Sequence, residues 1–280
     1  MAMQKFYRDC YLKNGWIPAQ ALTHGLGIGD VFQLDNGAMR PLLNLLEARL
    51  VEPVLVSEEV PLDPASWSLS HGMEQSYCEA RAVVGDNGTA GRVVRQALTF
   101  EEPGDYAFHC RDAVARFLVN WSDIAADLIL KLTQLHYTFR HVYVVTAVTR
   151  ARDWVLAVAA REGAQLETTS HHEEMDWSGQ MTHPSSRTEV LSGIFRFEIG
   201  RDQPAHFYKA RKLRLSDELE SRLLQQILEN RHRLGTDKLA NWLSADKVNL
   251  LKANELNLNT AMQSFDWCHM NLDDIAGLAD

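Results

Sequence analysis

The sequence is poor in cysteine and has no long apolar run. Its four cysteines, at positions 10, 78, 110 and 268, lie far apart and form no Cys-x-x-Cys pair, so neither a zinc ribbon nor a compact disulfide framework is predicted. No stretch approaches the roughly 18 apolar residues of a membrane-spanning helix, and the N-terminal segment lacks the apolar core of a signal peptide. We therefore expect a cytoplasmic protein with reduced thiols and no membrane helix.

Positive charge and catalytic motifs are also scarce. The formal net charge of −9 argues against a nucleic-acid-binding protein, whose basic surface should appear in the total. Neither a G-x-S-x-G turn nor a Walker loop is present. The glycines at 25, 27 and 29 resemble a nucleotide-binding loop, but Asp30 stands where its third glycine would fall. These absences give no positive evidence for an enzyme, and no cofactor is expected.

One cluster resembles a metal site. His171, His172, Glu173 and Glu174 are consecutive, and imidazoles and carboxylates can share one ion. Adjacent histidines point apart on a strand and lie about 100° apart on a helix, however, so a solvated loop is the favoured interpretation. No metal ligand is assigned.

What the chain does contain is an order of elements typical of an α+β protein. Helical spacing of apolar residues predicts a helix near residues 3–13, ended by Asn14-Gly15, and a long helix over Arg111–Leu135. Apolar and alternating runs predict strands at His141–Thr149, Asp153–Ala160 and Leu191–Ile199. Segments 15–34, 53–67 and 167–189 are read as irregular connections.

Two further features complete the pattern. Ser68–Val84 and Arg92–Glu102 flank Gly85-Asp86-Asn87-Gly88, which predicts a hairpin with many polar residues. Ser216 caps a predicted helix that ends near Leu234, where Gly235 follows. The fold class we expect is α+β, a twisted, mostly antiparallel sheet with flanking helices, followed by a short C-terminal tail.

The tail, Gly235–Asp280, is acidic and yet rich in large apolar side chains. It carries seven acidic and three basic residues and includes Trp242, Phe265 and Trp267. Such residues do not stay in water without a partner surface. The tail is therefore either a permanent last layer of the domain or a removable lid. A tethered lid has a high effective concentration at its docking surface, and proteolysis of the tether would remove this advantage.

The block 141–215 resembles the pore-forming domain of gasdermins. The resemblance is carried by the strand VYVVTAV, a short turn, the strand WVLAVAA, a polar excursion and the closing stretch FRFEIGRDQPAHFYKARKLRL. It implies a gasdermin-like N-terminal domain at 1–234 and an autoinhibitory tail at 235–280. Only the 46 residues of this tail follow Leu234, so the chain is similar to the short-tailed bacterial and fungal members.

The same resemblance implies a function. A partner protease would cut between Leu234 and Lys252. The released domain would then move from the cytoplasm into the membrane and self-assemble from a resting monomer into a large β-barrel pore, killing the cell in defence or non-self recognition. Two regions, near 68–102 and 153–199, would become the spanning hairpins, and their mixed polarity fits barrel strands.

Some bacterial members are lipidated on a cysteine near the N-terminus. Cys10 is the candidate here, although its place on the apolar stripe favours a structural role.

Basic side chains are the predicted contacts with anionic lipid, because each contributes about 1 kcal/mol near such a surface. The candidates are Lys5, Arg8 and Lys13, followed by Lys209, Arg211 and Lys212. The alternative is that they pair with acidic neighbours or with the tail.

One variant of the pore former and two other functions stay open. Pairing with a divergent partner chain could replace cleavage, as the fungal relatives suggest. A non-membrane interaction domain would keep the tail as a structural layer. A hydrolase or metal-dependent enzyme comes third.

Overall fold

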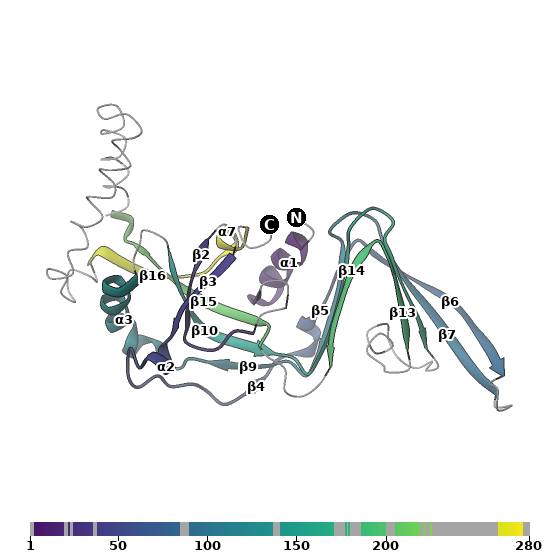
Figure 1. Ribbon diagram of the computed structural model, residues 1–280, viewed down its shortest axis with the longest axis horizontal. Coiled ribbons are helices and arrows are strands. Elements are labelled where there is room, and N and C mark those ends of the chain that lie inside the picture. Colours follow the sequence, from purple (N-terminus) through teal and green to yellow (C-terminus); the bar gives the residue numbers. More distant parts are fainter. Residues whose placement is uncertain are drawn as a thin grey trace.

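The computed structural model describes residues 3–19, 22, 25–35, 38–84, 90–136, 141–170, 177, 179, 186–199, 205–218, 221, 225 and 263–276. At its centre lies a sheet in the order β1-β15-β10-β2-β3 (Figure 1). These strands are β1 (Ile17–Pro18), β2 (Asp30–Asp35), β3 (Ala38–Asn44), β10 (Val142–Arg150) and β15 (Phe207–Leu215). β16 (Phe265–His269) pairs with β15, β9 (Val114–Phe117) with β10, and β4 (Val60–Pro61) with β9.

All strand pairings within the described ranges are antiparallel. The helical elements are α1 (Gln4–Asn14), α2 (Leu45–Ala48), η2 (Pro64–Trp67), α3 (Trp121–His136) and α7 (Leu272–Ala276). The expected α+β class with a mostly antiparallel sheet is therefore confirmed.

β10 is buried on both faces, which explains its run of valines. Tyr143 and Val145 join a core cluster that also contains α1, whereas Val142 and Val144 join a second cluster with α3. The predicted strand at 141–149 is confirmed within one residue at each end.

α1 forms as the apolar spacing predicts. Phe6, Tyr7 and Cys10 are buried on one side. Gly15 ends the helix with a φ of +68°, a left-handed conformation that glycine adopts at little steric cost. The basic residues predicted to meet lipid, Lys5, Arg8 and Lys13, lie outside this buried stripe, and Arg8 and Lys13 are exposed.

The predicted helix over Arg111–Leu135 is wrong in its first part. α3 begins only at Trp121, and Val114–Phe117 instead form β9 against β10. The side chain of Asn120 accepts a hydrogen bond from the backbone of Leu55 and donates one to Pro53. Sheet pairing and this loop contact, both distant in sequence, override the local helical spacing.

All three segments predicted to be irregular contain strands. The segment 15–34 holds β1 and most of β2, 53–67 holds β4, and 167–189 holds most of β12 (Gln165–Ser170) and the start of β13 (Arg187–Leu191). β12 pairs with β13 and with β7 (Ala90–Phe100). Polar sequences such as QLETTS form strands here because neighbouring strands supply their hydrogen bonds.

The polar hairpin and the strand after the turn at 150–152 are confirmed. β6 (Met73–Val84) pairs with β7, and β11 (Asp153–Ala159) pairs with β14 (Gly193–Ile199) and β8 (Tyr106–Arg111). β5 (Ser68–His71) completes this part of the molecule. Of the predicted helix Ser216–Leu234, only residues 216–218, 221 and 225 belong to the described part.

Candidate functional site

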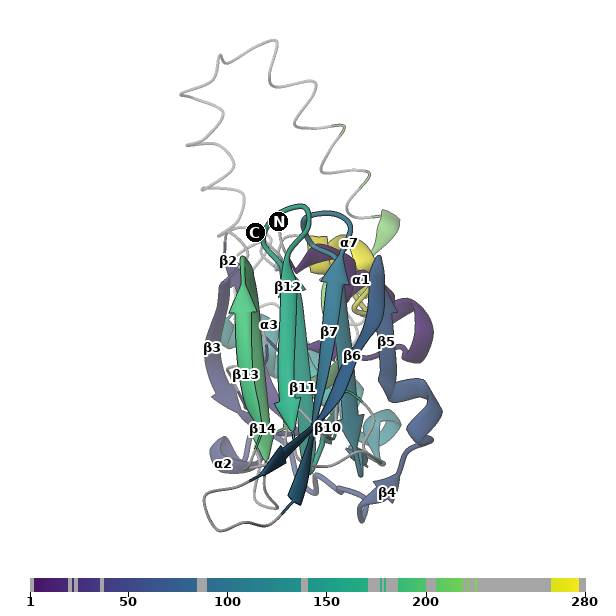
Figure 2. The same ribbon diagram turned by 90° about the vertical axis from the view of Figure 1, so that its right-hand side faces the viewer.

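Two long β-hairpins lie side by side and share one bend (Figures 1 and 2). Before the bend the strand order is β14-β11-β8-β5, and after it the order is β13-β12-β7-β6. The two orders match because β5 continues into β6, β7 into β8, β11 into β12 and β13 into β14. The two sheets are therefore one four-stranded sheet, folded across all its strands. We call the β6-β7-β12-β13 half the arm.

Each of the four strands is interrupted where it crosses the bend, and the strand register shows that the four interruptions lie side by side. Tyr106, at the start of β8, pairs with His71 at the end of β5 and with Val158 near the end of β11. Gly193, at the start of β14, pairs with Ala159 at the end of β11. Every strand thus turns along the same line, as a hinge requires.

Inner and outer strands turn differently. The outer strands turn at a single residue, Gly72 with φ +55° and Ser192 with φ +62°. The inner strands turn through the connections 101–105 and 160–164, each of which contains a glycine with positive φ, Gly104 or Gly163. A positive φ is uncommon outside glycine, so the bend at Ser192 requires support from its neighbours.

Backbone hydrogen bonds supply that support across the bend. The amides of Glu101, Ala160, Gly104 and Gly163 donate to the carbonyls of Gly72 (3.0 Å), Ser192 (3.0 Å), Ala159 (2.9 Å) and Phe100 (3.1 Å). The two hairpins therefore hold each other at the fold line, because the last two bonds run between them.

A small apolar cluster fills the inside of the fold. The arm contributes Leu98, Phe100 and Leu166, and the other half contributes mainly small residues, namely Ala107, Val155, Ala157 and Ala159. Alanines let the arm approach closely, and opening the bend would expose this cluster to water.

The arm is amphipathic. Alternate residues of β7 and β12, such as Leu98 and Leu166, are buried inside the fold. The opposite face is polar, with Arg95 paired to Glu167 across the strands. Gln96 and Thr168 are buried on the inner face, so this alternation is not purely apolar.

The tail enters the central sheet as an edge strand. β16 pairs with β15 from Arg211 to Leu215. Its Phe265 is buried, and its Trp267 indole donates a 2.9 Å hydrogen bond to the carbonyl of Ala125 in α3. The Trp267 ring also meets Trp121 edge to face, with centroids 4.9 Å apart.

α7 brings a carboxylate of the tail onto the other face of β15. Asp274 lies 2.8 Å from the ammonium of Lys212 and accepts a 2.9 Å hydrogen bond from the hydroxyl of Tyr143. Burial, followed by the nearby Asp274 charge, raises the pKa of Tyr143 above its usual value, which keeps this hydroxyl a donor.

The structure does not gather the six predicted lipid contacts into one patch. Lys5 pairs with Asp105 and Glu102, Arg8 with Asp9, and Lys13 donates to the carbonyl of Ser68. Lys209 lies over the ring of Trp16, Arg211 over that of Trp121, and Lys212 meets Asp274. All six have partners inside the protein in this state, so lipid binding by them stays a prediction.

Cys10 is fully buried in the core. Burial, followed by the nearby Cys110 thiol and the Asp9 carboxylate, raises the pKa of its thiol. In this conformation the thiol is inaccessible to a modifying enzyme, and lipidation of Cys10 stays a prediction for another state.

Other candidates fall outside the site. The His171–Glu174 cluster and the cleavage region Leu234–Lys252 lie outside the described residues. Among the residues that the structure does describe, no group of side chains is suited to hold a metal ion. No helix of that part has the length and apolar character needed to cross a bilayer.

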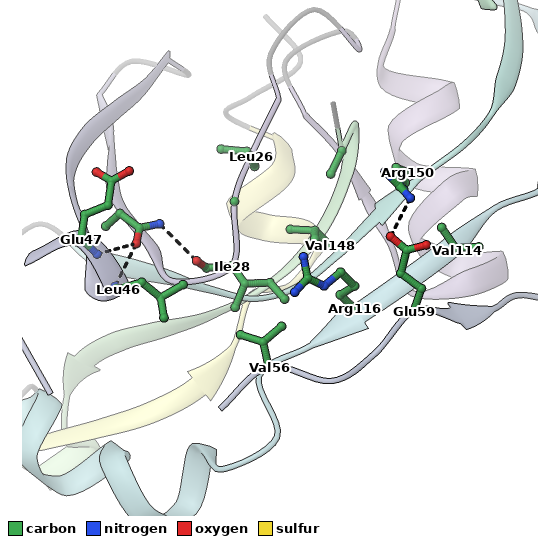
Figure 3. Close-up of a pocket in the computed structure, with 13 residues that line it drawn as sticks. Leu26, Ile28, Leu46, Glu47, Val56, Glu59, Val114, Arg116, Val148 and Arg150 are labelled. Carbon is green, nitrogen blue, oxygen red and sulfur yellow. Dashed lines mark hydrogen bonds and ion pairs between the residues drawn. The ribbon is translucent and has the colours of Figure 1, made fainter. Parts of the chain in front are cut away.

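A groove of about 370 Å³ lies beside β9 and β10 (Figure 3). Its polar groups already serve the fold. Arg150 pairs with Glu59 at 2.6 Å, and Asn44 caps α2 by accepting from the amides of Leu46 and Glu47. We assign it no ligand.

The comparison with known proteins finds a distant structural similarity. No protein-family model and no curated protein matches the sequence. Among solved structures, the chain is similar to one titled as a bacterial gasdermin from Bradyrhizobium tropiciagri, with a TM-score of 0.31 and 13% sequence identity. The similarity covers 74% of this chain and 86% of that one.

Sequence reasoning missed the residues that join distant segments. Asp105, Asp274 and Trp121 each meet a partner more than 60 residues away, and no local pattern marks them. Gly72 did carry a signal, because a glycine inside an alternating strand suggests a break.

Proposed function

We propose that this chain is a latent pore-forming protein. Residues 1–234 form the pore-forming domain and residues 235–280 the restraint. A protease partner cuts between Leu234 and Lys252, after which copies of the domain leave the cytoplasm, assemble in an anionic membrane as a β-barrel and kill the cell.

The bent four-stranded sheet is the observation that carries the proposal. A chain that supplies two adjacent hairpins to a barrel needs four neighbouring antiparallel strands with alternating polarity. The arm already has four neighbouring antiparallel strands, and burial alternates along its two inner strands, β7 and β12. β6 and β7 have 12 and 11 residues, and a tilted spanning strand needs roughly 9–11.

The tail's position supports its role as the restraint. It lies along the edge of β15, the strand that β1 also pairs with, and α7 packs against α1. Removing the tail would uncover that edge, the ring of Trp121 and the ammonium of Lys212. An open strand edge is a template for pairing with another chain.

Cleavage of the intact protein tests the proposal. A recognition sequence for a site-specific protease is inserted between Leu234 and Lys252, and dye release from anionic liposomes is measured before and after cutting. Leakage is expected only after cutting and only from anionic vesicles. The protein without the insertion, treated with the same protease, is the control. A cut and dissociated tail without leakage would refute pore formation.

A second function is favoured by one observation. β16 continues the central sheet, as a permanent layer of an interaction domain would. In that case the tail would stay bound after cutting, and the cut chain would elute as one complex without leakage.

A further inference from the structure

The carboxylate of Asp105 accepts three hydrogen bonds at the bend. It lies at the end of the connection 101–105, and its side chain is only 2% exposed. It accepts hydrogen bonds from the ammonium of Lys5 at 2.7 Å, the Nδ1 of His71 at 2.9 Å and the amide of Glu102 at 2.7 Å. A buried carboxylate is stable only with such partners.

Asp105 also packs directly against Gly72, the residue at which β5 ends and β6 begins. A Cβ atom added to Gly72 would lie 2.0 Å from the Asp105 Oδ2. No other residue type therefore fits at position 72 while the carboxylate is in place. The break between β5 and β6 and the break between β7 and β8 interlock at this point.

α1 provides the cation. Lys5 lies in its first turn and also reaches Glu102 at 3.1 Å. The helix is held beside the bend by three more contacts with β8. The ring of Phe6 packs on those of Tyr106 and Phe108, and the Tyr106 hydroxyl donates to Asp9 at 2.9 Å.

The same helix contacts the tail. α1 packs against α7, and the hydroxyl of Tyr11 reaches the carbonyl of Met270 at 3.4 Å. α1 thus lies between the tail and the bend, and it contacts both of them.

The ionisation of the pair agrees with this geometry. Burial opposes charge on Asp105, but the hydrogen bonds from Lys5, the Glu102 amide and His71 outweigh it, and its pKa lies below the usual value. The hydrogen bond to Asp105 in turn raises the pKa of Lys5. Both groups are charged at neutral pH, so separating them would leave a buried anion without its cation.

We propose that Lys5 and Asp105 form a latch through which the tail holds the bend closed. While α7 holds α1, Lys5 neutralises the buried carboxylate and the breaks at Gly72 and 101–105 stay interlocked. When α1 shifts, the carboxylate must reach water, and the bend opens. This inference rests on the proposed function, because it names the route by which tail release reaches the arm.

The latch is tested by hydrogen exchange on the full-length, uncut protein in solution. Lys5→Met should speed exchange of the 101–105 amides on the order of tenfold or more, since a hydrogen bond to a charged group is lost from a buried site. Lys13→Met is the matched control, because Lys13 lies on the same helix and bonds only a backbone carbonyl. Lys5→Arg should restore slow exchange.

Two further variants separate a latch from general loosening of the fold. In an Asp105→Asn background, Lys5→Met should add little, because no buried charge remains to be neutralised. Asp274→Asn, which loosens the tail far from the bend, should speed exchange at 101–105 as well as in β16. Unchanged exchange at 101–105 when β16 exchange rises would overturn the coupling.

The outcomes distinguish this inference from the proposed function. If cut protein leaks but Lys5→Met and Lys13→Met exchange alike at 101–105, the latch is wrong and pore formation stands. If Lys5→Met opens the bend but no cut protein leaks, the latch stands and pore formation is wrong. Should Lys5→Met not fold, as judged by circular dichroism, Lys5→Gln takes its place. The Asp274→Asn result tests the coupling between tail and bend independently of either Lys5 variant.

Discussion

The ammonium of Lys212 on β15 lies 2.8 Å from Oδ1 of Asp274, and both side chains are nearly buried, with exposed fractions of 12% and 6%. This ion pair joins the tail to the central sheet on the face opposite α3. Removing one partner of a buried pair costs roughly 3–5 kcal/mol, because the other charge is left without compensation. The pair is thus a principal attachment of the tail.

Asp274→Asn should therefore weaken docking of the tail by about 3 kcal/mol, since the amide keeps the acceptor for Tyr143 but loses the charge. Exchange of the β16 amides should rise roughly a hundredfold. Asp217→Asn is the control, because Asp217 pairs with Arg214 at the surface and its side chain is 78% exposed. That variant should change exchange little, and an equal effect of both would contradict the assignment.

Trp267 provides the second attachment. Trp267→Ala should loosen the tail by about 3 kcal/mol through lost ring contacts, whereas Trp267→Phe should cost about 1 kcal/mol, the loss of the bond to the Ala125 carbonyl. The rate at which a protease cuts and releases the tail of the folded protein measures this order. Equal rates for the two variants would mean that the ring contact with Trp121 contributes nothing.

The sequence predicted the strands whose causes are local. β10 and β11 are runs of valine and alanine buried on both faces, and α1 has a clear apolar stripe and a glycine stop. Their bounds followed, to within about one residue, from local apolar patterns and stop signals. The amphipathic character of the arm was visible as mixed polarity, but its alternating faces depend on which strands become neighbours.

The bend as a whole could not be predicted, because the contacts that align its four breaks are distant in sequence, even though a glycine such as Gly72 signals a local break. Ser192 adopts a positive φ, and Gly193 beside it is the only local sign of a break, so the apolar alternation of Leu191–Ile199 predicts one strand. Asp105 follows a Pro-Gly turn and meets a lysine 100 residues earlier. The local spacing of β9 likewise predicts a helix, and only its pairing with β10 makes it a strand.

Acidic pH should loosen the tail through His269. His269 is exposed in the docked strand, and partial desolvation, followed by the charges of Arg211 and Lys209, lowers its pKa there, whereas its imidazole in a released tail should titrate near 6.5. The released state therefore binds the proton more readily. Docking is at full strength above about pH 6.5 and weakens as the pH falls below it toward the docked pKa.

Cleavage of the tail at pH 7.5 and pH 5.5 checks this sign. The rate should rise at pH 5.5 in the unaltered protein, and His269→Gln should remove most of the increase. A rise of the same size in the variant would assign the effect to another group. Lowered rates at pH 5.5 in both, after correction for the protease's own pH profile, would reverse the expected sign.

The two faces of the arm should respond differently to the same charge. Thr188 pairs with the buried Thr168, so its side chain lies on the inner face, whereas Thr99 pairs with Gln165 on the polar face. In the proposed pore the inner face meets lipid, where a lysine costs about 2 kcal/mol, and the polar face meets water. Thr188→Lys should thus reduce leakage from the cut protein roughly tenfold or more, and Thr99→Lys should leave it nearly unchanged. Both residues are half-buried at rest, so thermal unfolding of the uncut variants gives the baseline. The opposite order of leakage, with comparable unfolding temperatures, would mean that the polar face is the one that meets the bilayer.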